Sequence, residues 1–300
     1  TLVFGSECGD AEMLRRAADC LLSPEFAAAL RVRLGEGTSF AAAREGTARA
    51  LIGAGADVLT QPNDILGVEY CKAIARQCAA MEPLALPRRA VGHDGGAAEG
   101  FASASHIREL LIRGESGDAY LTPESAAIYA RECAAGRAPV TMANAERAIL
   151  SRLRTMREEE LAAYDGGGEG LYHRVYRAIE RETGVEEILN AAKSKRYAHA
   201  RLRRLLLSAF LDVRTGELPE RMPYLRVLAC NARGREVLRK MKKTAVVPIL
   251  TKSADVRRLD ADAQALFALT ARATEEYVLA YPSLAAAKPG SAWTTDPVIL

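Results

Sequence analysis

The chain has 300 residues, of which 49% are hydrophobic and 26% are charged, and its formal net charge is +3. This composition is typical of a globular protein with a sizeable core and excludes a disordered chain, while the small net charge excludes a uniformly basic surface. The six cysteines form no Cys-x-x-Cys pair and no cluster with histidine, and no signal peptide or membrane span is visible. We therefore expect reduced thiols, no metal site, no membrane partner and a cytoplasmic location.

The first third of the chain alternates strand and helix patterns. A short apolar run at Leu2–Phe4 ends at Gly5, and an amphipathic helix follows over 11–22. This unit is typical of a parallel sheet with crossover helices. Because a strand opens the chain without a methionine, we expect it to be N-terminally truncated. Further elements are predicted as helices over 24–34, 39–54, 65–78 and 107–112 and as a strand over 84–86.

From about residue 121 the strand patterns nearly disappear and helical patterns dominate. The predicted helices cover 123–134, 143–163, 171–183, 185–193, 197–211, 224–242 and 260–281. One later strand is predicted over 246–250, at a sheet edge because of Pro248, and the tail beyond Pro282 is predicted to be weakly structured. The fold class is therefore α/β: a partial Rossmann-like parallel sheet in residues 1–120, followed by a mainly helical region in residues 121–300.

Several polar segments lie where strands end or helices begin. In an open parallel sheet these ends meet at one crevice, where ligands bind. The run Ser103–Arg108 opens a helix, so its hydroxyls, backbone N–H groups and arginine form a candidate anion site. Ser103 and Asn63 can equally act as helix caps, and Arg108 can simply face solvent. Together, the segments predict a nucleotide site with these members: Gly5, Asn63, Arg88, Arg89, Ser103, Ser105 and Arg108.

Positive charge is concentrated in two segments of the second half. Residues 193–204 contain no acid, and residues 233–243 contain Glu236 alone. Such runs are usually solvated helix faces, but here Tyr197 and His199 are interleaved, which suits phosphate contacts combined with base stacking. Arg152 and Arg154 are weaker candidates for the same surface. The candidate RNA-binding residues are Lys193, Lys195, Arg196, Arg201, Arg203, Arg204, Lys240, Lys242 and Lys243.

Eight motifs, in order along nearly the whole chain, carry a resemblance to a known family. They are Phe4-Gly5-Ser6-Glu7, Gln61-Pro62-Asn63-Asp64-Ile65-Leu66-Gly67, His93-Asp94, Ala102–Arg108, Glu169-Gly170-Leu171, Lys193-Ser194-Lys195-Arg196-Tyr197, Arg201-Leu202-Arg203-Arg204 and Leu225-Arg226-Val227-Leu228. The sequence resembles the bacterial tRNA(Met) cytidine acetate ligases. The resemblance implies a nucleotidylyltransferase-like ATP-binding domain in residues 1–120, followed by a helical tRNA-binding region in residues 121–300.

The resemblance also implies an activity. The family activates acetate with ATP, giving acetyl-adenylate and pyrophosphate, and transfers the acetyl group to the exocyclic amine of the wobble cytidine in elongator tRNA(Met). By motif, Gly5, Asn63 and one arginine of the Arg88-Arg89 pair would contact ATP. The serine motif, with Ser103, Ser105 and Arg108, would hold its phosphates, and Mg²⁺ would arrive with the nucleotide.

One family motif is absent. The chain contains no His-x-Gly-His sequence, and His93 and His106 are not spaced to replace it. The catalytic residues are therefore unassigned, and we expect the chain to be catalytically incomplete without a preceding segment. Two alternatives stay open at this point, namely another nucleotidylyltransferase that acts on a small cofactor precursor, and a non-catalytic RNA-binding relative. The residues indicate neither the acyl specificity nor the oligomeric state.

Overall fold

The computed structural model describes residues 1–35, 39–88, 97–98, 100–165, 170–194 and 197–300. The chain divides into two compact units, Thr1–Ala126 and Ala127–Leu300. The assignment of residues 1–120 to ATP binding and of residues 121–300 to tRNA binding stays a prediction. None of the helices in the described ranges is long and apolar enough to cross a membrane.

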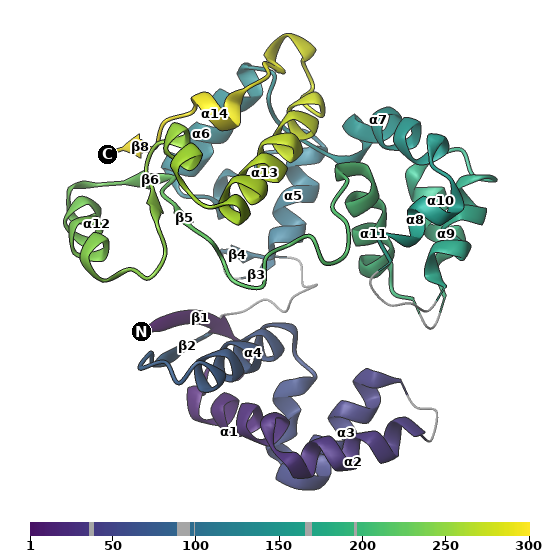
Figure 1. Cartoon of the computed structure of the whole chain (residues 1–300), viewed down its shortest axis with the longest axis vertical. Helices are drawn as coiled ribbons and strands as arrows, with labels where there is room; N and C mark the ends of the chain where they lie inside the picture. Colours follow the sequence, from purple (N-terminus) through teal and green to yellow (C-terminus); the bar gives the residue numbers. More distant parts are fainter. Residues whose placement is uncertain (36–38, 89–96, 99, 166–169, 195–196) are drawn as a thin grey trace. The chain divides into compact units, whose positions relative to one another are not determined.

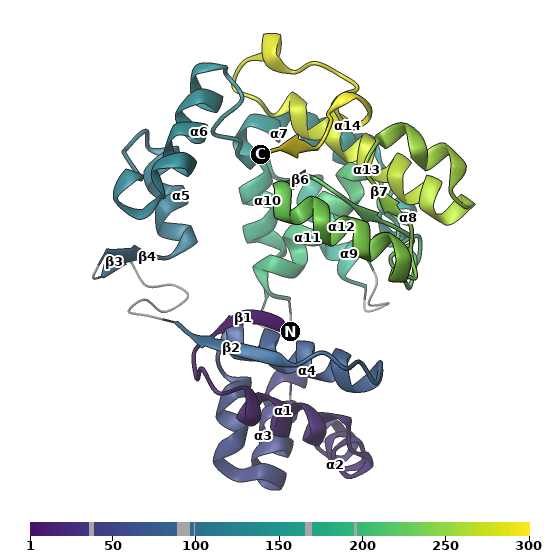
Figure 2. The same ribbon diagram turned by 90° about the vertical axis from the view of Figure 1, so that its left-hand side faces the viewer.

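A parallel pair of strands organises the first unit. Strands β1 (Leu2–Ser6) and β2 (Pro83–Pro87) pair in register from Leu2 opposite Pro83 to Ser6 opposite Pro87. The chain between them forms α1 (Ala11–Leu22), α2 (Pro24–Gly35), α3 (Phe40–Ile52), the 3₁₀ helix η1 (Gly53–Leu59) and α4 (Pro62–Arg76). Figures 1 and 2 show these helices on one face of the strand pair, with α1 and α4 nearest to it. The predicted parallel α/β arrangement is confirmed.

Close packing of α4 on β1 fixes the position of the helix start. A Cβ on Gly67 would lie only 2.7 Å from Phe4 Cε2 and 2.9 Å from Leu14 Cδ1, so only glycine allows this approach. On the opposite face of the strand pair, the side chains of Val3 and Leu84 stay half exposed. The alternation of buried and exposed residues along each strand therefore turns one face of the strand pair toward α1 and α4.

The remainder of the first unit is a short hairpin followed by helices. Its elements are β3 (Ala97–Ala98), β4 (Phe101–Ala102), α5 (Ala104–Ile112), the 3₁₀ helix η2 (Asp118–Tyr120) and α6 (Pro123–Ala134), which extends across the division between the units. Helix α5 begins three residues earlier than the sequence predicts, because the Ser103 hydroxyl accepts a hydrogen bond from the N–H of His106 and caps the helix.

The second unit begins with a helical bundle. It contains α7 (Met142–Thr155), α8 (Glu158–Ala162), α9 (Leu171–Ile179), α10 (Val185–Ala192) and α11 (His199–Leu211), and these helices share one apolar core. The prediction of one helix over 143–163 is wrong. The backbone is extended at Met156, whose side chain is buried, and α8 starts afresh where Glu160 accepts a hydrogen bond from the N–H of Arg157.

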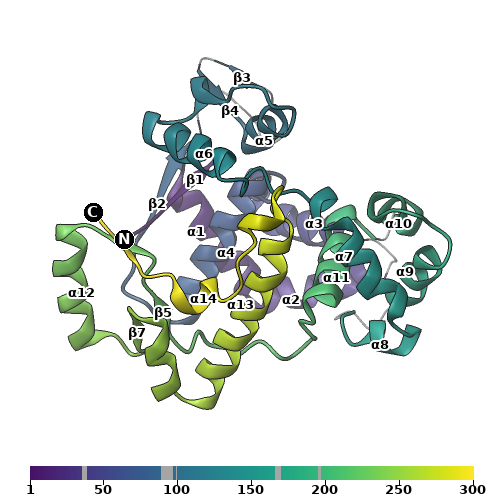
Figure 3. The same cartoon turned by 90° about the horizontal axis from the view of Figure 1, so that it is seen from above.

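The last part of the second unit has its own small core, centred on Phe267. Its elements are β5 (Leu225–Arg226), β6 (Ala229–Cys230), α12 (Ala232–Thr244), β7 (Ile249–Leu250), η3 (Ser253–Arg258), α13 (Ala261–Leu279), η4 (Leu284–Ala286), α14 (Ser291–Thr294) and β8 (Val298–Ile299). Figure 3 shows β5, β7, α12, α13 and α14 from above. The predicted helix over 224–242 is wrong in its first part. Helix α12 begins only after Asn231, whose Oδ1 accepts a hydrogen bond from the N–H of Gly234 and caps the helix.

The tail beyond Pro282 also differs from its prediction as weakly structured. It forms α14 and β8, and β8 pairs in parallel with β6 through hydrogen bonds such as that from the N–H of Val298 to the carbonyl of Leu228. Its order therefore depends on pairing partners some 70 residues earlier in the chain, which no local pattern reveals.

Candidate nucleotide and RNA sites

A buried aspartate organises the carboxyl end of the strand pair. Asp64, in the first turn of α4, is only 2% exposed. The Ser6 hydroxyl donates to its Oδ1 at 2.5 Å, and the backbone N–H of Cys8 donates to both carboxylate oxygens at 3.2 Å. The N–H of Gly9 in turn donates to Ser6 Oγ at 3.0 Å. Asp64 therefore shapes the loop that follows β1, with donors that lie 56 to 58 residues away in sequence.

A second carboxylate, Glu7, occupies the N-terminus of α4. Its Oε1 accepts a hydrogen bond from Asn63 Nδ2 at 2.6 Å, and its Oε2 accepts one from the N–H of Asp64 at 2.9 Å. Burial opposes ionisation of Glu7, but these hydrogen bonds outweigh it and hold the pKa of Glu7 below its usual value. The helix end that would attract a phosphate thus already holds an anion, and Asn63 Oδ1 is left without a donor in the described ranges.

Two more predicted site residues lie at the same end of the strands. The N–H of Arg88 donates to the carbonyl of Ser6 at 2.9 Å, and its side chain is exposed. A Cβ on Gly5 would lie 3.7 Å from Arg88 Cγ. The structure therefore brings Gly5, Asn63 and Arg88 to one end of the strand pair, as the sequence predicts. Arg89, His93 and Asp94 lie outside the described residues.

The serine motif is placed on α5. Ser103 is 5% exposed and its hydroxyl is used as the helix cap, whereas Ser105 Oγ accepts a hydrogen bond from Arg108 Nη2 at 3.3 Å near the surface. Within the described ranges, no hydrogen bond or ion pair connects these three residues to the end of the β1–β2 pair. Their role in holding phosphates stays a prediction, and of the three residues Arg108 is the exposed one.

The described residues contain no group of three or more histidine, cysteine, aspartate or glutamate side chains that could hold a metal ion. All six cysteines are free thiols.

Among the predicted RNA-binding residues, Arg201 has an internal role. Its Nη2 lies 3.5 Å from Oδ1 of Asp165, whose side chain is 2% exposed, and its guanidinium carbon lies 5.3 Å from the centre of the Tyr197 ring. Tyr197 itself is buried in the core of the bundle, so the expectation that it stacks on a base is wrong. His199 is half buried, with Nε2 3.0 Å from Asn190 Oδ1.

The other basic candidates differ from Arg201. Six are exposed and form no ion pair with any described residue, namely Lys193, Arg203, Arg204, Lys240, Lys242 and Lys243. Lys195 and Arg196 lie outside the described part of the chain. Exposed side-chain cations without ion-pair partners can neutralise the phosphates of an RNA backbone, but contact with RNA stays a prediction.

Comparisons with known proteins decide the family. The sequence model of the HIGH nucleotidyl transferase family matches residues 1–291. The chain is 33% identical over 301 residues to the tRNA(Met) cytidine acetate ligase of Caldanaerobacter subterraneus subsp. tengcongensis, with coverage of 96% of this chain and 73% of the relative. It is 30% identical to that of Syntrophomonas wolfei subsp. wolfei, with 99% and 76% covered.

The chain belongs to the tRNA(Met) cytidine acetate ligase family.

Solved structures from this family share the fold. The apo crystal structure of Thermotoga maritima TmcAL superposes with a TM-score of 0.91 at 27% identity, covering 99% of this chain and 76% of that chain. The structure of the same protein bound with alpha-thio ATP superposes with a TM-score of 0.89 at 28% identity, with the same coverage. The α/β nucleotidylyltransferase-like fold of the cytidine acetate ligase family is therefore shown for this chain.

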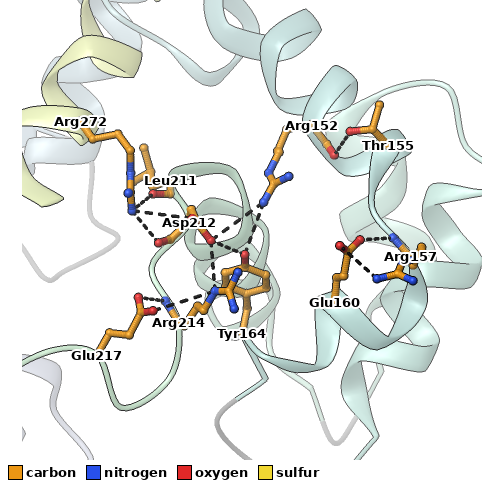
Figure 4. Close-up of polar contacts among 10 residues, drawn as sticks. All are labelled: Arg152, Thr155, Arg157, Glu160, Tyr164, Leu211, Asp212, Arg214, Glu217 and Arg272. Atoms are coloured by element: carbon orange, nitrogen blue, oxygen red, sulfur yellow. Dashed lines mark hydrogen bonds and ion pairs between the residues drawn. The ribbon is translucent and has the colours of Figure 1, made fainter.

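Arg152 and Arg154, the weaker RNA candidates, are engaged within this member of the ligase family. Arg154 Nη2 donates to the carbonyls of Glu182 and Thr183 at 3.3 and 3.2 Å. Arg152 Nη2 lies 3.5 Å from the Tyr164 hydroxyl (Figure 4). Both guanidinium groups hold parts of the bundle together.

Asp212 is the centre of a network that the sequence did not reveal. It caps α11 in the left-handed conformation, with φ 53°, and its Oδ1 accepts hydrogen bonds from the Tyr164 hydroxyl at 2.5 Å and from Arg214 Nε at 3.4 Å. From α13, Arg272 Nη2 donates to the Asp212 carbonyl at 2.8 Å (Figure 4). The Tyr164 hydrogen bond lowers the pKa of Asp212, burial opposes it, and Arg214 and Arg272 lower it further. Burial and Asp212 together raise the pKa of Tyr164.

Proposed function

We propose that this protein is an ATP-dependent ligase that activates acetate and acetylates the wobble cytidine of elongator tRNA(Met). The observation that carries this proposal is the match of nearly the whole chain to curated tRNA(Met) cytidine acetate ligases, at 33% identity over 96% of its length. It is supported by the TM-score of 0.89 to a structure bound with alpha-thio ATP.

The end of the β1–β2 pair suits the nucleoside part of ATP. Asn63 Nδ2 donates to Glu7, which fixes the orientation of the amide. Asn63 Oδ1 can then accept a hydrogen bond from an amino or hydroxyl group of adenosine. At the N-terminus of α4, the Glu7 carboxylate would repel a phosphate. In this proposal Gly5 admits the nucleoside, and the phosphates meet Arg88, Arg89 and the serine motif with Ser103, Ser105 and Arg108. A Mg²⁺ ion would be bound through the ATP phosphates and belong to the substrate.

The reaction consists of two displacements. A carboxylate oxygen of acetate attacks the α-phosphorus of ATP, and pyrophosphate leaves with the electrons of the broken P–O bond. The exocyclic amine of cytidine then attacks the acetyl carbon, AMP leaves with the electrons of the C–O bond, and the amine loses a proton. Both steps bring anions together, so the protein contributes chiefly by positioning the reactants and neutralising charge.

The exposed lysines and arginines favour an RNA substrate over a small cofactor precursor. Arg203 and Arg204 on α11 and the lysines of α12 have no described partners, and a site for a small molecule has no use for them. A polyanion that crosses these helices would neutralise them.

The test is a labelling experiment on the full-length gene product. The protein is incubated with ATP, ¹⁴C-acetate and an elongator tRNA(Met) transcript, and the RNA is digested to nucleosides. We expect ATP-dependent label in acetylcytidine, and none with a transcript in which uridine replaces the wobble cytidine. Absence of label, or equal label in both transcripts, would contradict the proposal.

A further inference from the structure

A groove of about 410 Å³ runs beside α9 in the second unit. We call it the α9 groove: Arg174, Arg177 and Arg181 line one side, and Ala191 of α10 lies on the other. It contains none of the residues that the sequence analysis assigned to nucleotide or RNA binding.

Arg174 and Arg177 share one face of α9 because they are three positions apart, and Arg181 follows in the turn beyond the helix end at Ile179 and lines the same groove. The opposite face carries Leu171 and Val175, which are buried in the bundle core. Three like charges along one groove repel one another, which costs stability unless something compensates for it. A cluster of like charges that does not stabilise the fold indicates a role in binding an anion.

Arg174 differs from its two neighbours. Its Nε donates to the carbonyl of Ala192 at 2.6 Å, and its Nη2 donates to that of Lys193 at 3.1 Å. Its guanidinium therefore caps the C-terminus of α10, where the helix dipole is negative, and holds the far wall of the groove in place.

The side chains of Arg177 and Arg181 have no hydrogen bond or ion pair to any described residue, and both residues are exposed. The acids nearby do not neutralise them. Glu182 lines the groove but forms no ion pair in the described ranges, and Glu158 is paired with His173 at 2.7 Å. Two guanidinium groups thus face the groove beside a single acid.

We infer that the α9 groove binds a backbone phosphate of the RNA substrate, with Arg177 and Arg181 contacting its oxygens and Arg174 positioning the wall. The inference rests on the proposed function. The groove offers small side chains, such as Ala178 and Ala191, and no aromatic face except His173, so it lacks a surface on which a free nucleotide could place its base. Lys193, an exposed cation, follows directly after the wall that Arg174 holds, so positive charge continues along the chain as a polyanion requires.

The experiment measures binding of the full chain to a fluorescently labelled elongator tRNA(Met) transcript at several KCl concentrations. The test variant is Arg177→Gln/Arg181→Gln. The matched control, Arg147→Gln/Arg221→Gln, removes two exposed arginines of the same unit that have no described partner and do not line the groove. We expect the test variant to bind on the order of tenfold more weakly and the magnitude of its salt slope to fall by about 1, because the two arginines neutralise one phosphate and each neutralised phosphate contributes about one unit.

Two further measurements sharpen the result. Arg177→Lys/Arg181→Lys keeps the charge and should recover most of the salt slope, and the affinity of every variant for ATP should equal that of the wild type. A test variant that behaves like the control would overturn the inference, as would a loss confined to ATP binding, which would make the ligand a free nucleotide. A wild-type chain that does not bind the transcript at all would instead contradict the proposed function, and the two failures are thereby distinguished.

Discussion

The end of the β1–β2 strand pair and the α9 groove use polar residues in opposite ways. At the strand ends, Ser6, Glu7, Asn63 and Asp64 are bonded to one another before any ligand arrives. In the α9 groove, Arg177 and Arg181 have no described partner. A site of the first kind is preorganised, so its residues cannot be removed without damage to the fold, whereas a site of the second kind acts through charge and is sensitive to salt.

The largest expected effect is that of Asp64→Ala. This change leaves the Cys8 N–H without an acceptor and the buried Ser6 hydroxyl with only the weak acceptor Cys8 Sγ. Each poorly satisfied group costs about 1–3 kcal/mol, so we expect a loss of about 3 kcal/mol in the free energy of unfolding. Urea denaturation of the full chain measures it. The control is Glu69→Ala on the same helix, where an exposed ion pair with Lys72 is worth about 0.5 kcal/mol. Equal losses for the two variants would show that the network does not hold the loop.

A smaller effect is expected from Asp212→Asn, which keeps a side chain that tolerates positive φ but removes the charge facing Arg214 and Arg272. Because the site is partly exposed, we expect a loss of about 1 kcal/mol at neutral pH. The pKa of Asp212 is lowered in the folded state, so its contribution is present above the unfolded value and disappears as pH falls through the folded value. The two proteins should therefore converge in acid, and a gap in urea stability that persists at low pH would contradict this.

Local patterns predicted much of this fold and less of its sites. Periodicity and turn residues located β1, α1 and α4, because neighbours in sequence decide those elements. The predicted helix over 224–242 was wrong because Leu225 and Ala229 pair with Ile249 and Val298, which no local window contains. The roles of Asp64 and Asp212 were missed for the same reason, since their partners lie dozens of residues away.

The contribution of Glu7 should be smaller still and depend on pH. Glu7→Gln keeps the shape and one acceptor at the start of α4 but removes the charge that favours a helix N-terminus, which is worth roughly 0.3–1 kcal/mol. Because hydrogen bonds from Asn63 and the backbone outweigh burial and lower the pKa of Glu7, the wild type should be the more stable protein above the unfolded value and lose that advantage as pH falls. An unchanged difference between neutral pH and acid would contradict this arrangement.

The smallest effect on stability is expected from Arg108→Ala, because the only described side-chain contact of Arg108 is the exposed hydrogen bond to Ser105. Its free energy of unfolding should change by less than about 0.5 kcal/mol. If Arg108 holds ATP phosphates, isothermal titration should show weakened ATP binding, while tRNA affinity and its salt slope stay at the wild-type values. The Arg177→Gln/Arg181→Gln variant should show the reverse pattern. Both changes leave the fold intact. If one variant loses ATP binding and the other loses tRNA binding, Arg108 is a nucleotide-binding residue and Arg177 and Arg181 are RNA-binding residues. If each variant loses both ligands, the assignment of separate ligands to α5 and to the α9 groove is contradicted.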